Sequence, residues 1–264
     1  MGLNQLMKGE LEMEKFLSDK TCEFFSIQKI EDIILLNFKK NLLASATDLR
    51  FRDMVMDCLD WISKTESIKV IIIARSHEIK GSEEYFDFYH QAFTSKTDRY
   101  DVHRLHNVFS QIILKIVDLN KIVIHATSGT VISLFLNVSL ACDYRIITDN
   151  TVFQNPYLKM EMVPIGGGAF FLSRRIGRSK ALEILLSETD IFAHEALKLG
   201  LVDEVVAADK LQEAALDAAR RFARKPAHSL AGLKQLLNYY LKDLKDYLEV
   251  ENQVLLKIVG SRYC

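Results

Sequence analysis

Residues that interrupt regular structure are scarce in this chain. Its 264 residues include 3 prolines and 11 glycines, and no stretch is rich in proline, glycine and serine together. Because such stretches mark turns and flexible linkers between domains, their scarcity predicts one folded unit without a long linker. With 49% hydrophobic residues, a chain of this length buries roughly three quarters of the surface that it exposes when unfolded.

Cysteine is scarce as well. Cys22, Cys58, Cys142 and Cys264 lie far apart, form no Cys-x-x-Cys pair and have no histidine at the spacing that zinc sites use. This pattern indicates reduced, structural thiols rather than disulfides or a metal site. We therefore expect no metal ion and no tightly bound cofactor.

An excess of charge of one sign is also lacking, since the formal net charge is −1 at pH 7. A chain without a basic field is not expected to bind nucleic acid. The longest apolar stretch, Val131–Cys142, is interrupted by Ser133, Asn137 and Ser139 and is shorter than the roughly 20 residues that cross a membrane. Residues 1–17 carry acidic groups and no apolar core, unlike a secretory signal. A cytoplasmic location without membrane contact is expected.

Strand and helix patterns alternate along the chain. In residues 23–38, apolar and polar residues first alternate, and an apolar run then follows the polar break at Lys29–Asp32. This pattern predicts a two-stranded hairpin. From Ser45, with Asp48 three residues later as a capping box, apolar residues recur at helical spacing. The β-branched run at residues 68–74, IKVIIIA, is typical of a strand buried on both faces of a parallel sheet.

The alternation continues toward the C-terminus. Strand patterns occur at residues 121–126, 143–148 and 201–206, and helical patterns at 102–119, after Ser128-Gly129, and at 169–176, 179–186, 193–199, 209–224 and from 228 onward. Strands that alternate with helices imply right-handed crossovers and a layered α/β fold. We predict an N-terminal extension (1–20), an α/β core (21–207) and a helical C-terminal region (208–264).

Three stretches of the chain resemble one known family. They are RRIGRSKALEILLSETDIFAHEALKLGLVDEVVAADKLQEAA (residues 174–215), SLACDYRI (139–146) and VPIGGGAFFLSRRIG (163–177). They resemble the crotonase (enoyl-CoA hydratase/isomerase) superfamily runs GxxxAxEllLtgxxIxAxEAlxxGLVdxVv, laCDiria and vPgaGgtqrLxrxiG. The resemblance extends over about residues 22–256. It implies a crotonase-like spiral of ββα units with a helical C-terminal trimerisation region.

The resemblance also implies a site for a coenzyme A thioester. In the family, two backbone N–H groups bind the thioester oxygen and stabilise the enolate that forms, and each such donor is worth a few kcal/mol. One donor falls on Gly81 or Lys80, depending on a one-residue ambiguity of register. The other falls on Leu134, where the family usually has glycine, so the side chains of Leu134 and Phe135 either fill the site or line it.

The carboxylates that hydrate an enoyl thioester are missing from their family positions. Asn137 and Tyr157 occupy the two places that are usually Glu. Asn has no titratable proton, and a Tyr with a pKa near 10 is a poor base at neutral pH. Glu161, four residues beyond Tyr157, is an alternative carboxylate, and the family's first-loop Asp falls on Glu84 or Glu83. Ordinary enoyl-CoA hydratase activity is expected to be very weak or absent.

Histidines and glycines supply further candidates. His125 lies in a strand pattern and fits a satisfied core histidine, whereas His103 and His106 lie on a mixed polar helix and fit solvated side chains. Gly166–Gly168 open a helical pattern, where the positive end of the helix can face an anion. The resemblance favours this ligand-binding role for Gly166 and Gly167 over a plain flexible turn.

Two functions remain open. The first is a lyase or isomerase that binds an acyl-CoA thioester and performs enolate chemistry, such as isomerisation, with Tyr157, Asn137 and Glu161 near the reacting carbons. The second is a non-catalytic binding or scaffolding protein, a pseudoenzyme of this fold. No Gly-x-Ser-x-Gly motif supports acyl transfer or hydrolysis. The resemblance implies a homotrimer or a dimer of trimers. The family's usual last helix over CoA is not found after residue 264, and this is expected to weaken CoA binding.

Overall fold

The computed structural model describes residues 22–39, 42–75, 81–94 and 99–261, so the expected extension at residues 1–20 lies outside them. The main sheet has the strand order β1-β2-β3-β4-β6-β9. Its strands are β1 (Phe25–Ile30), β2 (Ile33–Phe38), β3 (Val70–Arg75), β4 (Ile122–Thr127), β6 (Tyr144–Thr148) and β9 (Glu204–Val206). β1 and β2 form the predicted antiparallel hairpin, and the remaining neighbours are parallel.

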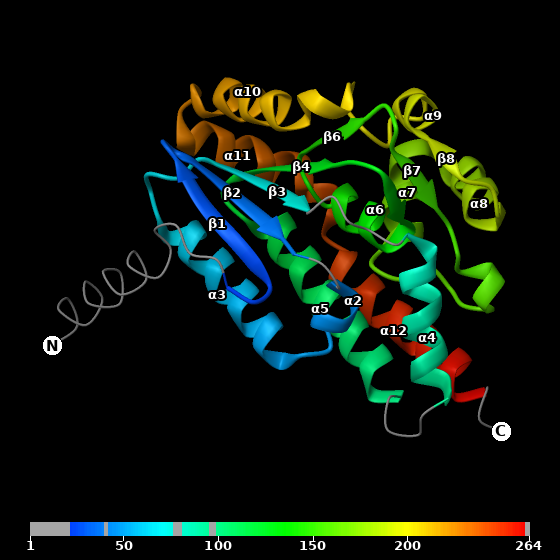
Figure 1. Ribbon diagram of the computed structural model, residues 1–264. Coiled ribbons are helices and arrows are strands. Elements are labelled where there is room, and N and C mark those ends of the chain that lie inside the picture. Colours follow the sequence, from blue (N-terminus) through cyan, green and yellow to red (C-terminus); the bar gives the residue numbers. More distant parts are fainter. Residues whose placement is uncertain (1–21, 40–41, 76–80, 95–98, 262–264) are drawn as a thin grey trace, which may run out of the picture.

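Helices cover both faces of this sheet (Figure 1). α3 (Leu49–Lys64) and α5 (Arg99–Asp118) cover one face, and α12 (Leu244–Ser261) packs against α5. α10 (Leu211–Ala223) covers the opposite face and contacts β3, β4 and β6. The layered α/β fold predicted from the alternating patterns is therefore confirmed.

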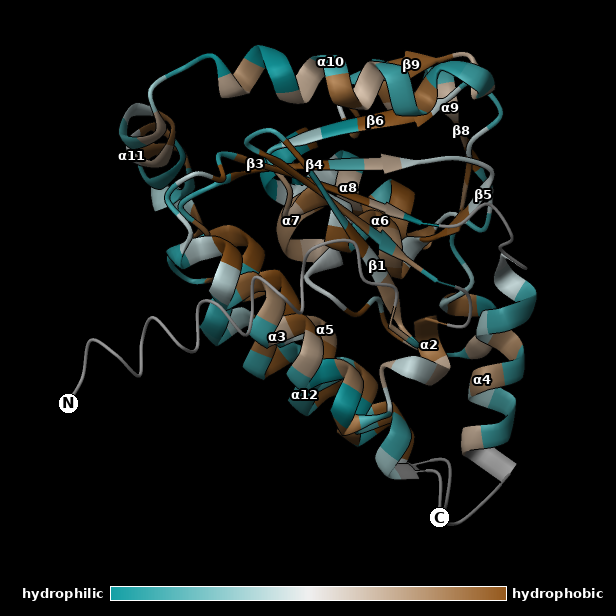
Figure 2. Cartoon of the chain, turned by 60° about the vertical axis from the view of Figure 1, so that its left-hand side comes forward, coloured by the Kyte–Doolittle hydropathy of each residue, from teal (hydrophilic) through white to brown (hydrophobic). Residues whose placement is uncertain are grey.

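The inner position of β3 in the sheet explains why polar and apolar residues do not alternate along it. Val70 and Ile72 pack against the alanines of α10, whereas Ile71 and Ile73 belong to the larger core beneath α3 and α5. All four side chains are buried, as expected for an inner strand of a parallel sheet. Figure 2 shows the strands largely in brown, with teal concentrated on the outer surfaces of the helices.

A second, smaller sheet lies beside the first. Its strands are β5 (Thr130–Ile132), β7 (Val152–Gln154) and β8 (Ile191–Phe192), in the order β5-β7-β8. The helices α6 (Ser133–Leu140) and α9 (Ala193–Lys198) contact its strands, while α7 (Gly168–Ile176) packs against α6 and α8 (Arg178–Leu186) packs against α7. The sequence did not predict this sheet, because strands of two or three residues are too short to show an alternating pattern.

The remaining helical elements connect these layers. They are α2 (Leu42–Ser45), α4 (Ser82–Thr94), α11 (Ala227–Asn238) and the 3₁₀ turns η1 (Leu158–Met160), η2 (Ala208–Lys210) and η3 (Tyr239–Leu241). In the ranges that the structure describes, no helix is long and apolar enough to cross a membrane.

Two predicted helix starts are wrong by a few residues. Ser45 ends α2 instead of capping α3, and the N-cap of α3 is Asp48, whose carboxylate accepts a hydrogen bond from the Arg50 backbone N–H at 2.8 Å. Asp209 lies in η2, and α10 starts two residues later. In both places a residue able to cap a helix lies within a few residues of the observed start, so the sequence pattern alone did not fix the first residue of the helix.

One buried cation, the Lys234 ammonium, links the C-terminal helix α11 to the core. The ammonium of Lys234, on α11, donates hydrogen bonds to the carbonyls of Ile116 and Lys121 at 2.9 and 3.0 Å. It also donates to the Asp143 carboxylate at 2.8 Å. Since burial of an unpaired charge is costly, these contacts tie α11 to the ends of α5, β4 and β6.

Candidate functional site

The expected second thioester donor lies at the start of α6. All eight residues of this helix are buried, and Leu134 is 0% exposed. A Cβ atom placed on Gly166 would lie 2.9 Å from Leu134 Cδ1. The Leu134 side chain therefore fills the space between the first turn of α6 and the glycine turn before α7.

The expected first donor, Gly81, precedes α4 and packs against the small sheet. Its φ of +61° favours glycine, and a Cβ there would lie 2.6 Å from Thr130 Cγ2. Next to it, the Ser82 backbone N–H and hydroxyl both donate to Gln154 Oε1, at 3.0 and 2.8 Å. These contacts fix Gly81 beside β5 and β7. The alternative donor, Lys80, lies outside the described residues.

Asn137 and Tyr157, the two positions at which the resemblance led us to expect glutamates, lie together. The Asn137 side-chain N–H₂ donates to the Ile165 carbonyl at 2.8 Å and to the Tyr157 hydroxyl at 3.3 Å. The two residues are 2% and 1% exposed. A Cβ on Gly168 would lie 2.6 Å from Asn137 Nδ2, so the amide also packs directly on the start of α7.

The surroundings of Tyr157 are largely aromatic, and the charge of Glu251 also acts on its hydroxyl. Its ring lies edge-on to Tyr85, with centroids 6.0 Å apart, and the Tyr85 ring lies tilted against Tyr89, with centroids 4.7 Å apart. Burial raises the pKa of Tyr157 far above its ordinary value of 10, and does the same for Tyr85 and Tyr89. Tyr157 is thus a neutral hydrogen-bonding group at physiological pH and not a general base.

A glutamate that the sequence did not single out fills the glycine turn. Glu251, on α12, is 5% exposed. Its Oε1 accepts from the Gly166 backbone N–H at 2.7 Å, and its Oε2 accepts from the Gly167 N–H at 3.1 Å. His106 Nε2 lies 3.3 Å from the same carboxylate. The two amides that we expected to face a ligand thus bind a carboxylate of the protein itself.

This arrangement corrects the expectation for His106, which is buried rather than solvated. The helix face that carries His106 lies against α12. The His106–Glu251 contact joins residues 145 positions apart, so no local sequence pattern could predict it. His103 is partly exposed and lies 3.0 Å from Asn107 Nδ2. The only sequence signal for Glu251 was an acid among the apolar residues of a helical pattern.

The other acidic candidates, Glu161, Glu83 and Glu84, are less buried than Asn137 and Tyr157. Glu161 is exposed and ends η1 with a left-handed φ of 51°. Glu83 and Glu84 lie in the first turn of α4, with Glu83 exposed and Glu84 partly buried. Across residues 22–39, 42–75, 81–94 and 99–261, no three His, Cys, Asp or Glu side chains gather in a way suited to a metal ion.

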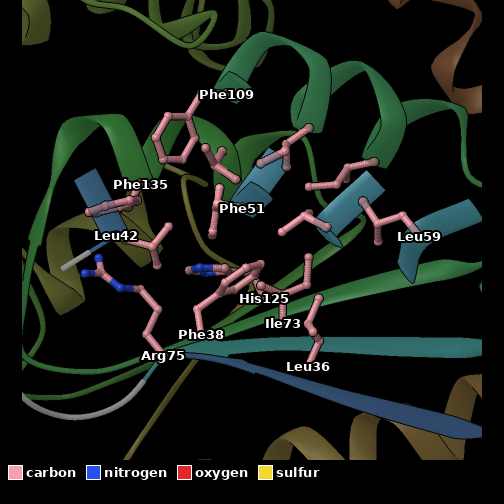
Figure 3. Close-up of a pocket in the computed structure, with 14 residues that line it drawn as sticks. Leu36, Phe38, Leu42, Phe51, Leu59, Ile73, Arg75, Phe109, His125 and Phe135 are labelled. Carbon is pink, nitrogen blue, oxygen red and sulfur yellow. The ribbon is translucent and has the colours of Figure 1, made fainter. Parts of the chain in front are cut away.

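A cavity of about 40 Å³ lies between the main sheet and the helices α3, α5 and α6 (Figure 3). Arg75, the last residue of β3, reaches one end of it, and the guanidinium carbon lies 3.8 Å from the Phe135 ring centroid. His125 points into it from β4. Burial, and then the charges of Arg75 and Arg145, lower the pKa of His125 to about 3, so the imidazole is neutral at physiological pH.

The overall fold is shared with solved enoyl-CoA hydratases. One from Bacillus halodurans superposes with a TM-score of 0.78 at 22% identity, over 90% of this chain and 95% of that chain. One from Bacillus anthracis superposes with a TM-score of 0.72 at 20% identity, over 88% and 90%. At these identities the likeness shows the fold.

Sequence comparison gives the family. A sequence model described as enoyl-CoA hydratase/isomerase matches residues 29–262, and the chain belongs to this family, as the motifs predicted. "Probable enoyl-CoA hydratase EchA17" of Mycobacterium bovis is 38% identical over 109 residues, or 41% of this chain and 42% of that protein. A fatty acid oxidation complex subunit alpha of Pseudomonas syringae is 39% identical over 104 residues, which is 14% of its length. The matched segment spans less than half of these curated relatives.

Proposed function

We propose that this protein binds an acyl-CoA thioester and does not hydrate it. The thioester oxygen would accept hydrogen bonds from the backbone N–H groups of Gly81 and Leu134. The observation that carries the proposal is the buried Asn137–Tyr157 hydrogen bond, which stands where hydration needs two carboxylates. Each missing acid or base is worth roughly 10²- to 10⁴-fold in rate.

The two side chains support orientation of the acyl group rather than proton transfer. Asn137 donates hydrogen bonds, and the raised pKa of Tyr157 keeps its hydroxyl protonated. Isomerase-like enolate chemistry would require a base, and the exposed Glu161 is the sequence candidate for that role. We also propose a cytoplasmic protein without a cofactor beyond the coenzyme A of its ligand.

A thermal-shift series with acyl-CoA esters and free CoA tests the binding. A ligand at about 100 times its dissociation constant adds about 2.7 kcal/mol of stability, and hydration of crotonyl-CoA should stay at background. Leu134→Gly should enlarge the shift, because it clears the space at the second donor. Leu136→Gly is the matched control, since it removes an equally buried leucine from the same helix. No shift with any ester would refute the proposal.

The second candidate, a scaffolding protein without a small-molecule ligand, is favoured by the complete burial of Leu134 against Gly166. For either candidate we propose a homotrimer or a dimer of trimers. The exposed apolar side chains of α11, with Leu236 76% exposed, support an interface there. Light scattering that gives the mass of a monomer at micromolar concentration would contradict the assembly.

A further inference from the structure

The start of α6 is fixed by side chains from outside the helix. Ile132, which stands at the N-cap position, makes no side-chain hydrogen bond to it. The first four N–H groups of a helix have no acceptor within that helix, so the Leu134 N–H can bind an oxygen atom of a ligand. The direction in which this N–H points then depends on what holds Ser133, the first residue of α6.

Strand pairing places Ser133 beside Asn155. The strands β5 and β7 run parallel, with Ile132 opposite Gln154, and Ser133 and Asn155 are the next residues along the two chains. The Ser133 hydroxyl donates to Asn155 Oδ1 at 3.4 Å, and Ser133 is only 9% exposed. A hydrogen bond of this length is weak on its own, so its effect depends on how firmly Asn155 is held.

The nitrogen of the Asn155 amide is held by the end of α8. Asn155 Nδ2 donates to the carbonyls of Ile184, Leu185 and Ser187, at 3.3, 3.4 and 3.2 Å. Carbonyls at the end of a helix lack donors within that helix, which is why a side-chain amide is suited to this place. One side chain thus joins the end of α8 to the start of α6.

The Ser133 hydroxyl also acts on the candidate site. Burial is the main cause of the raised pKa of Tyr157, and the Ser133 hydroxyl acts on that pKa in the opposite direction as a hydrogen-bonding neighbour. Asn137 donates to the Tyr157 hydroxyl at 3.3 Å. Ser133 therefore links Asn155 to the two side chains that we expect near the reacting carbons.

We propose that Asn155 is a positioning residue of the thioester site. It holds the Ser133 side chain, and through it directs the Leu134 N–H toward the thioester oxygen, without touching the ligand itself. This inference rests on the proposed binding of an acyl-CoA thioester. It gives the amide a role beyond capping α8, because loss of the amide should change the polarisation of the ligand as well as the stability of the protein.

The stretching frequency of the thioester carbonyl measures this polarisation. Butyryl-CoA that is isotopically labelled at the carbonyl is bound to the full chain and compared with the free ester by infrared difference spectroscopy. Binding to the parent should lower the frequency. Ser133→Ala should remove about half of that shift, because one of the two donors is misdirected, and should weaken binding about three- to tenfold.

Ser139→Ala is the matched control. Ser139 is a buried serine of the same helix, and its hydroxyl donates to the Leu136 carbonyl at 2.6 Å, so its loss should leave the carbonyl frequency unchanged. Asn155→Leu should move the frequency as Ser133→Ala does. The variant with both Ser133→Ala and Asn155→Leu should match either single variant, because both substitutions break the same connection.

The results distinguish this inference from the proposed function. Absence of butyryl-CoA binding by the parent would refute the proposed function and the positioning role with it. Binding with an unchanged carbonyl frequency in Ser133→Ala, or an equal change in Ser139→Ala, would overturn the positioning role alone. Additive effects of Ser133→Ala and Asn155→Leu would also overturn it, since Asn155 would then not act through Ser133.

Discussion

Glu251 Oε1 accepts a hydrogen bond from the backbone N–H of Gly166 at 2.7 Å. Gly166 and Gly167 both have left-handed φ angles, 79° and 75°, which turn successive N–H groups toward one point and make an anion-binding concavity. A residue of the last helix occupies it. The C-terminal helix therefore sets the conformation of the turn that leads into α7.

Replacement of Glu251 by Gln should destabilise the protein by about 1.5–3 kcal/mol. The amide keeps one oxygen but turns its N–H₂ toward a buried backbone N–H, so one donor is left unpaired. Urea unfolding measures the change. Glu249→Gln, an exposed position on the same helix, should change stability by less than about 0.5 kcal/mol. Equal effects of the two variants would contradict the buried role.

Gly168→Ala should cost about 1–3 kcal/mol, although alanine is the better helix former by about 1 kcal/mol. The reason is the 2.6 Å approach of the added Cβ to Asn137 Nδ2. In an Asn137→Ala background the same substitution should become neutral or stabilising, which a double-mutant cycle measures. Gly232→Ala on α11 meets nothing within 4 Å and should stabilise. Additive effects would show that Asn137 and Gly168 do not contact.

Stability should fall in mildly acidic solution because of His125. Its pKa is lowered from 6.5 to about 3 in the folded protein, so the unfolded chain takes up a proton below about pH 6.5 while the folded chain does not. The contribution of His125 to the free energy of unfolding is fully present above about pH 6.5 and is lost as the pH falls toward 3. Between about pH 7 and pH 5 the loss is about 2 kcal/mol.

The measurement is urea unfolding at both pH values for the parent and for His125→Gln, which lacks the titrating group. The loss between the two pH values should shrink by about 2 kcal/mol in the variant. His194→Gln, at an exposed histidine, should leave it unchanged. An equal decrease in unfolding free energy between the two pH values in all three proteins would show that groups other than His125 cause it.

Replacing Asn137 and Tyr157 by glutamate should not produce hydratase activity. Both positions are buried, and the new carboxylates would be desolvated and close to each other, which raises their pKa and destabilises the fold by at least about 3 kcal/mol. Turnover of crotonyl-CoA should stay at background while the Leu134 side chain crowds a thioester bound at the second donor. Addition of Leu134→Gly is the comparison, and turnover above background in the double variant with Leu134 intact would show that this side chain does not limit the reaction.

The elements that the sequence predicted are those in which one local pattern determines the structure. β3 was evident because burial on both faces favours an unbroken β-branched run, here residues 70–73, and α3 was evident because Phe51, Val55 and Leu59 repeat at helical spacing. The pairing of His106 with Glu251 could not be predicted. It joins two polar positions on separate helices, and their separation in sequence leaves no periodic trace.

The candidate site also has a part that the sequence predicted and a part that it did not. Motif spacing singled out Asn137 and Tyr157 as site residues, and the structure brings them into contact. Whether Leu134 would fill or line the space depended on the approach of Gly166 from a different loop, which spacing does not encode. Arg75 gave no signal, because a single arginine at the end of a strand is indistinguishable from a surface charge.

The ammonium of Lys234, bound to Ile116, Lys121 and Asp143, has a consequence for synthesis of the chain. The ribosome makes the N-terminal part of a protein first, so β4 and the start of β6 emerge long before their buried cation. Until residue 234 has left the ribosome, the Asp143 carboxylate and two carbonyls lack this partner. Completion of the core is therefore a late event, and the nascent sheet is exposed to chaperones and to neighbouring chains for most of its synthesis.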